Sequence, residues 1–196
     1  MVRKAAAPAL LALITAIGLL TESAAPVGAA DSASACPYTD VPSQQLTLDQ
    51  FDYSTFCLIN EARVANGVQR LQRNALLHRA ARDYTSAMLR GRFFSHHGDF
   101  AGNPGASTPI RRARAIGYVR PGYVWVVGED LHWSTPETSS AGQIVQAWLN
   151  SSIHRFWLLK PKFDELGVAG ERGTPIDPDL PDGITVAAEF GFRRER

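Results

Sequence analysis

The sequence predicts an α+β fold in one domain spanning residues 46–196. Segments with the apolar spacing of helices come first, strand-like runs interleave late in the chain, and neither an internal repeat nor a linker is evident. The chain has 196 residues, of which 45% are hydrophobic and 20% charged, and this suits a globular domain with its own core.

The first predicted helix begins at a capping box, in which the Thr47 hydroxyl and the Gln50 amide satisfy free backbone groups. The helix ends at Asn66-Gly67, because glycine tolerates the left-handed conformation of a helix stop. Between these signals, small and apolar residues recur with helical spacing at Phe51, Thr55, Leu58, Ala62 and Ala65.

Three further helices are predicted by similar signals. Asn74 caps the second, which Gly91 closes, and Thr108-Pro109 opens a short third that ends at Gly117. A fourth is expected to start at Thr135-Pro136. The apolar residues expected to face the core are Leu77, Ala81, Tyr84 and Met88 in the second helix, and Ile144, Val145, Trp148 and Leu149 in the fourth.

Three strands are predicted between and after these helices. The run from Tyr123 to Val127 is β-branched and aromatic, which is typical of a buried strand. A second strand is expected from Phe163 to Gly170, and a third from Ile184 to Phe190, where apolar residues alternate with others. The prolines and Gly183 between the last two mark a hairpin-like loop with an acidic tip.

Residues 1–30 are typical of a secretory signal. Arg3 and Lys4 precede an apolar stretch up to Leu20, and small residues follow as far as Ala30. We expect cleavage after Ala29 or Ala30, and therefore a secreted protein with an irregular tail over residues 31–45. The alternative is a retained anchor, although the apolar run falls short of the roughly 20 residues that a span needs.

The charge balance argues against nucleic acid as a partner. The chain has 20 basic and 19 acidic residues, and cleavage of the signal would leave equal numbers of each. No basic stripe and no polybasic membrane patch is evident. Arg111, Arg112 and Arg114 cluster locally and are expected to form a solvated helix face.

The two cysteines, Cys36 and Cys57, predict a disulfide in an exported chain. Such a bridge would close a loop of about 20 residues and stabilise the protein by about 3 kcal/mol. The alternative is a lipid-modified Cys36, but the preceding Ala33-Ser34-Ala35 lacks the large aliphatic residue expected there.

Five phrases give the chain a family resemblance: Leu58 to Arg63, Phe93 to His96, Gly128 to Asp130, Trp148 to Arg155 and Glu189 to Gly191. Together they resemble the bacterial branch of the CAP superfamily, the SCP-like extracellular domains related to cysteine-rich secretory and plant PR-1 proteins. The resemblance covers about 140 residues, nearly all of the chain after the signal. It implies an α-β-α sandwich, with a central, mainly antiparallel sheet between helical layers.

The resemblance also implies that His96, Glu129 and His154 converge in a cleft, although they are far apart in sequence and share no short metal motif. Two imidazoles and a carboxylate could hold zinc with one position open for water. Ser151 stands where animal members carry a second glutamate, and Asp130 stands where the family has asparagine. Two neighbouring carboxylates would raise one pKa or attract a cation.

Structural alternatives stay open for each of these residues. His96 could be a loop histidine after two buried phenylalanines, and Glu129 could cap backbone amides in a turn. Ser151 is three residues before His154, but without a nucleophile elbow or an orienting acid a packing or capping serine is favoured. Of the other polar residues, His132 is a candidate for the cleft rim, Glu189 either lines the cleft or faces solvent, and His78 and His97 are expected at the surface.

The incomplete catalytic set favours a binding protein over an enzyme. We expect a secreted monomer that requires no cofactor, and that binds a lipid, sterol-like or cell-envelope molecule, with zinc as a candidate ligand of the cleft. One alternative is a metal-assisted hydrolase of peptide or cell-wall bonds, with Glu129 as a zinc ligand or as the base for a bound water. The other is a structural interaction protein of the cell envelope.

Overall fold

Four strands form a single mixed sheet in the computed structural model, which describes Met1 and residues 35–98, 108–177 and 179–196. The strands are β1 (Gln72–Arg73), β2 (Tyr123–Ser134), β3 (Glu165–Arg172) and β4 (Ile184–Glu195), in the spatial order β1-β3-β4-β2. β1 runs parallel to β3 and the other neighbours are antiparallel. Because β2 pairs only with β4 in this order, it is an edge strand.

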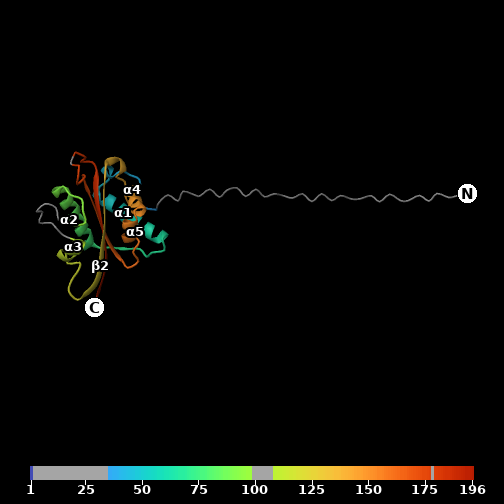
Figure 1. Cartoon of the computed structure of the whole chain (residues 1–196). Coiled ribbons are helices and arrows are strands. Elements are labelled where there is room, and N and C mark those ends of the chain that lie inside the picture. The colour runs from blue at the N-terminus through green and yellow to red at the C-terminus, as the bar shows by residue number, and fades with distance from the viewer. Residues whose placement is uncertain (2–34, 99–107, 178) are drawn as a thin grey trace. The chain divides into compact units, whose positions relative to one another are not determined.

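Helices cover both faces of this sheet. α1 (Leu48–Ala65), α4 (Ala141–Asn150) and α5 (Ser152–Leu158) lie on one face, and α2 (Ala75–Gly91) and α3 (Pro109–Ala115) lie on the other (Figure 1). Two short 3₁₀ turns, η1 (Ser43–Gln45) and η2 (Pro136–Thr138), complete the elements. The predicted α+β sandwich is therefore confirmed.

The two faces of the sheet bury alternate residues of β4. Ile184, Val186, Ala188 and Phe190 pack with Phe51, Ile59 and Trp148 in the larger core. Ala187 faces the other way, into a smaller cluster with Ala81, Tyr84 and Met88 of α2. Helices cover both faces of the sheet, so both faces of β4 are buried. The residues that alternate along β4 therefore belong to two buried layers, and neither set faces solvent.

The helix caps were predicted well. Thr47 and Gln50 make the capping box of α1, and the Asn74 and Thr108 side chains accept backbone amides at the starts of α2 and α3. The predicted stripe of α2 is buried, but Ala65 of α1 is exposed. Besides its apolar residues, the inner face of α1 carries buried polar groups, including Asp52, Asn60 and Arg63.

Several boundaries differ from the prediction. β2 and β4 each continue to 12 residues, because they pair with each other along their whole length. The predicted fourth helix is divided: Pro136 begins only the turn η2, Ser140 caps α4, and the chain breaks again at Ser151 before α5. The two-residue β1 was missed, since only its pairing with β3 defines it.

The described part of the N-terminal tail packs on the domain. Cys36 is buried and bonded to Cys57, which confirms the predicted disulfide. The Gly142 amide donates to the Thr39 carbonyl at 2.8 Å, and the Ser43 amide donates to the Ser139 hydroxyl at 3.1 Å. Residues 36–45 are therefore part of the fold, while the predicted signal and its cleavage site lie outside the described residues.

Within the described ranges, no helix has the length and apolar character needed to cross a membrane.

Candidate functional site

Glu129 lies in the middle of the edge strand β2, directly opposite Glu189 of β4. Their neighbours on the same face, Leu131 and Ala187, pack against α2, so both glutamates point into the layer between the sheet and the α2–α3 side. Both carboxyl groups are almost fully buried. Two buried carboxyl groups on directly paired strand residues need a countercharge or a shared proton.

Arg112 of α3 supplies the countercharge. Its guanidinium pairs with Glu129 Oε2, its Nε lies 3.5 Å from Glu189 Oε1, and it stacks over the Tyr84 ring at 3.4 Å. Burial raises the pKa of both glutamates and Arg112 opposes the rise, while the Glu129 charge raises the pKa of Glu189 further. Since Arg112 pairs more closely with Glu129, we assign the charge to Glu129 and the shared proton to Glu189.

His96, in the segment after α2, completes this network. Its Nδ1 lies 2.7 Å from Glu129 Oε1, and its carbonyl oxygen accepts from Arg112 at 3.4 Å. A carboxylate only accepts, so Nδ1 carries the proton and Nε2 keeps a free lone pair. Burial lowers the pKa of His96, as does the charge of Arg112, which leaves a neutral imidazole at neutral pH.

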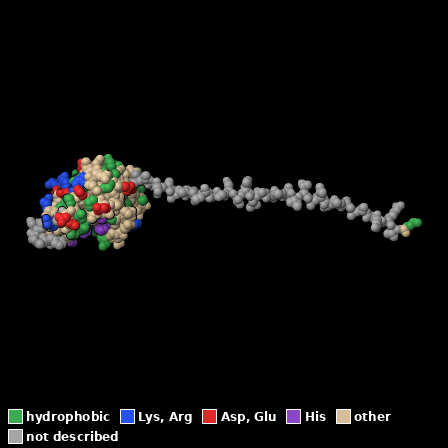
Figure 2. Space-filling view, turned by 90° about the horizontal axis from the view of Figure 1, so that it is seen from above, with side chains coloured by type: hydrophobic (Ala, Val, Ile, Leu, Met, Phe, Trp, Pro, Cys, Tyr) green, Lys and Arg blue, Asp and Glu red, His purple; other side chains and the backbone are tan. Residues whose placement is uncertain are grey.

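Two more histidines approach the same edge from the other face of the sheet. His132 of β2 lies edge-on to Trp148, with the ring centres 6.4 Å apart, and His154 lies on α5. Burial, followed by the charge of His154, lowers the pKa of His132 to about 4. Burial likewise lowers the pKa of His154, followed by the charge of His96. In Figure 2, histidine side chains lie close together on the surface at one edge of the domain.

These donors fit zinc only in part. Neutral imidazoles are good zinc ligands, and a carboxylate that holds the far nitrogen of a ligating histidine is a common supporting group. Glu129, however, already contacts His96 with one oxygen and Arg112 with the other. In the described residues, the one group of three potential ligand side chains within 4.8 Å of one another is Cys36, Cys57 and Glu61, whose cysteines are in the disulfide.

His96, Glu129 and His154 thus form no such compact group in this arrangement, and their role as metal ligands stays a prediction. The residues that would hold zinc are His96, through Nε2, and His154. Glu129 fits the supporting position better than the ligand position, because its oxygens are occupied.

Ser151 lies at the break between α4 and α5, where its amide donates to Trp148 and its carbonyl accepts from Arg155. It is the junction residue of two helices, so it and His154 do not share one continuous helix with Trp148 as the sequence suggested. Its side chain makes no cap hydrogen bond to α5.

Asp130 is fully buried on the opposite face of β2 from Glu129. Neither of its oxygens has a hydrogen-bond partner among the described residues. Burial raises its pKa to about 9, and the neighbouring Glu129 charge contributes. Neighbouring carboxylates were expected either to raise one pKa or to attract a cation. For Asp130 the structure favours the raised pKa.

Arg112 is the site residue that the sequence analysis missed. It was expected on a solvated face, yet it is buried while Arg111 and Arg114 are exposed. The available signal was its position next to Ala113 and four residues before Ile116, on the inner face of a short helix. Glu189 is buried, so the solvent-facing alternative for this residue is wrong. His97 is exposed as expected, whereas His78 bonds the Val168 carbonyl.

Several residues of the five sequence phrases support the fold and not the site. Buried Arg63 donates to the carbonyls of Gln69, Leu158, Lys160 and Phe163, and Asn60 exchanges two hydrogen bonds with the Leu71 backbone. At Gly128, any Cβ would lie 2.7 Å from the Trp157 ring and 2.8 Å from Phe163, so the close packing of α5 on β2 requires glycine.

Comparisons with solved structures agree with this fold. An outer surface protein from Borrelia burgdorferi superposes with a TM-score of 0.60 at 21% identity, covering 76% of this chain and 97% of that one. An extracellular SCP-domain protein from Bacillus anthracis superposes with a TM-score of 0.54 at 22% identity, covering 74% and 43%. At these identities the likeness establishes the fold alone.

Sequence comparisons identify the family. The uncharacterized protein YkwD of Bacillus subtilis (strain 168) is 28% identical over 130 residues, which is 66% of this chain but only 45% of that relative. The chain thus spans less than half the length of this relative. The model of the cysteine-rich secretory protein family, CAP, matches residues 56–175, more than half of the chain. The protein is therefore a member of the CAP family.

Proposed function

We propose that the protein is an extracellular binding module that holds a ligand at the histidine edge of its sheet, and that a divalent cation such as zinc is bound there by His96 and His154. The observation that carries the proposal is the contact of His96 Nδ1 with Glu129, which leaves Nε2 as a lone-pair donor. The lowered pKa of both histidines keeps them deprotonated at neutral pH, as metal binding requires.

The same network favours binding over hydrolysis. A general base for a metal-bound water needs a carboxylate free to accept a proton. Glu129 is instead engaged by His96 and Arg112, and Glu189 holds the shared proton. The hydrolase alternative predicts metal-dependent turnover that Glu129→Gln abolishes.

A second candidate ligand is an apolar molecule of the cell envelope. Ile153 and Phe156 of α5 expose 68% and 56% of their surface, and they flank His154 in sequence. Exposed large apolar residues beside a ligand site favour contact with an apolar partner. Zinc and an envelope lipid can be tested separately, because the first depends on the imidazoles and the second on these two side chains.

The deciding experiment is zinc titration by calorimetry on the oxidised, exported protein, with His96→Ala and His154→Ala as test variants. His97→Ala is the matched control, since His97 is the exposed neighbour of His96. We expect stoichiometric binding that both test variants lose and the control keeps. If the parent protein fails to bind zinc, the metal part of the proposal is wrong, and binding of envelope lipid by the parent and by Phe156→Ser becomes the test of the remainder.

A further inference from the structure

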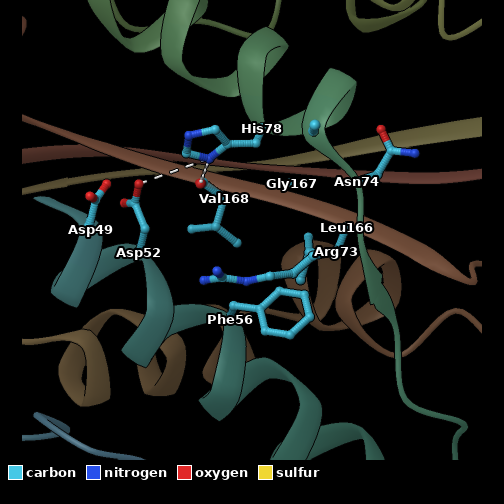
Figure 3. A pocket seen from close by; sticks show the side chains of 10 residues that line it. Asp49, Asp52, Phe56, Arg73, Asn74, His78, Leu166, Gly167 and Val168 are labelled. Atoms are coloured by element: carbon cyan, nitrogen blue, oxygen red, sulfur yellow. Dashed lines mark hydrogen bonds and ion pairs between the residues drawn. The ribbon is translucent and has the colours of Figure 1, made fainter.

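A cavity lies at the opposite edge of the sheet from the histidine cluster. It has a volume of about 540 Å³ and lies between α1 and α2 beside β3. Asp49, Asp52 and Phe56 of α1, Arg73 of β1 and His78 of α2 contribute side chains to its wall, over the apolar Leu166 and Val168 (Figure 3). Its volume lies within the range of small-molecule sites, roughly 300–1,000 Å³.

Asp52 is held in this wall with one oxygen engaged and the other facing the cavity. Its side chain is only 9% exposed, and Oδ1 accepts from the Gly170 amide at 2.7 Å. Oδ2 is 4.0 Å from His78 Nδ1, but that nitrogen is bonded to the Val168 carbonyl at 2.6 Å. Because a carbonyl accepts, Nδ1 donates its proton there, and Oδ2 has no hydrogen-bond partner among the described residues.

Arg73 supplies the opposite charge but does not neutralise Asp52. Its guanidinium lies over the rings of Phe56 and Tyr53, at 4.9 and 5.2 Å from their centres. Of the ion pairs between described residues, none joins Arg73 to a carboxylate. Burial raises the pKa of Asp52 to about 7, which the Gly170 hydrogen bond opposes, and the nearby charges of Asp49, Arg73 and Arg82 act more weakly. The rise shows that the hydrogen bond and these charges do not offset the burial of the Asp52 carboxyl.

A cavity that keeps a buried carboxylate and a guanidinium apart offers both signs of charge to one ligand. We propose that this cavity binds a small zwitterionic α-amino acid with an apolar side chain. Its ammonium group would pair with Asp52 and Asp49, its carboxylate with Arg73, and its side chain would lie against Phe56 and Leu166. A purely cationic ligand would leave Arg73 repelled, and a purely anionic ligand would do the same to the two aspartates.

The test uses three ligands that differ by one charged group. Leucine, isopentylamine (leucine without its carboxylate) and 4-methylpentanoate (leucine without its ammonium) are titrated into the oxidised, exported protein, with binding followed by calorimetry and by NMR shifts. A hydrogen bond to a charged group contributes about 1.5–3 kcal/mol, so we expect leucine to bind about 10- to 100-fold more tightly than either analogue.

Variants then connect the binding to the cavity. Asp52→Asn retains an acceptor for the Gly170 amide, and Arg73→Gln removes the cation, so each is expected to weaken leucine binding about 10- to 100-fold. Asp179→Asn and Arg111→Gln, at exposed positions, are the matched controls and should bind like the parent. The proposal is overturned if leucine shows no saturable binding at millimolar concentration, if isopentylamine binds as well as leucine, or if the controls weaken binding equally.

Discussion

The Nδ1 atom of His96 and the Oε1 atom of Glu129 lie 2.7 Å apart, and this contact joins the loop after α2 to the middle of an edge strand. It fixes which ring nitrogen carries the proton, and it occupies one oxygen of a carboxylate whose other oxygen pairs with Arg112. Glu129, the glutamate of the Gly128 to Asp130 phrase, is therefore placed to orient the His96 ring.

We predict that Glu129→Gln weakens zinc binding without abolishing it. Loss of a carboxylate behind a ligating histidine typically lowers metal affinity 10- to 100-fold, because the ring loses its fixed tautomer and part of its basicity. Calorimetric titration of the variant beside His154→Ala measures the difference, with exposed Glu137→Gln as a control. Unchanged zinc affinity in Glu129→Gln would contradict the supporting role, and complete loss would favour Glu129 as a direct ligand.

We also predict that replacing Arg112 and replacing Glu189 have unequal effects on the free energy of unfolding. Arg112→Met removes the cation from two buried carboxyls and is expected to cost about 3–5 kcal/mol of unfolding free energy. Glu189→Gln replaces a protonated carboxyl by an amide that can still donate to Glu129, so it should change the stability by less than about 1 kcal/mol. Urea denaturation of both variants at neutral pH measures this. Equal destabilisation would show that Glu189 is ionised in the native protein.

Much of the fold could be predicted because its signals are local. The capping residues Thr47, Asn74 and Thr108 bond backbone amides two or three residues away, so their helices can be recognised without knowledge of the tertiary fold. The period-two pattern of residues 184–190 is similarly local. The full extent of β2 and β4 was missed, because it results from their pairing with each other.

The site depends on non-local relationships that the chain alone does not display. Glu129 faces Glu189 only because of the register between β2 and β4, 60 residues apart in sequence, and Arg112 reaches both only because α3 packs on that face. The family resemblance supplied His96, Glu129 and His154, but not the guanidinium between the two glutamates. A charged residue on the inner face of a helix is the feature that would have indicated it.

The buried Asp130 leads to a third prediction, that Asp130→Asn stabilises the protein at neutral pH. The pKa of about 9 means that folding at pH 7 must bind a proton to a carboxyl that is ionised in the unfolded chain. Asparagine has nearly the same shape and no such cost, and it is also the residue of the family phrase. We expect an increase in unfolding free energy of up to about 4 kcal/mol by urea denaturation at pH 7, which is the cost of protonating this carboxyl at that pH. A destabilised variant would indicate that Asp130 has a hydrogen-bond partner as an acid that an amide cannot replace.

The fourth prediction concerns Asp52 and the pH dependence of stability. Its pKa is about 7 in the folded protein and 3.8 in the unfolded chain, so the native state binds more protons between these values. The contribution of Asp52 is therefore fully present below about pH 4 and is lost as pH rises through about 7, by up to about 4 kcal/mol.

Asp52→Asn removes this titration and retains an acceptor for the Gly170 amide. The variant should be close to the parent protein in unfolding free energy at about pH 4, and it should be the more stable of the two at about pH 8. Comparing variant with parent at each pH cancels the titrating groups that do not interact with Asp52. A difference that stays constant with pH would mean that Asp52 is already ionised in the native protein, paired with a cation. In that case the cavity beside β3 would lack the free carboxylate that binding of an amino acid requires.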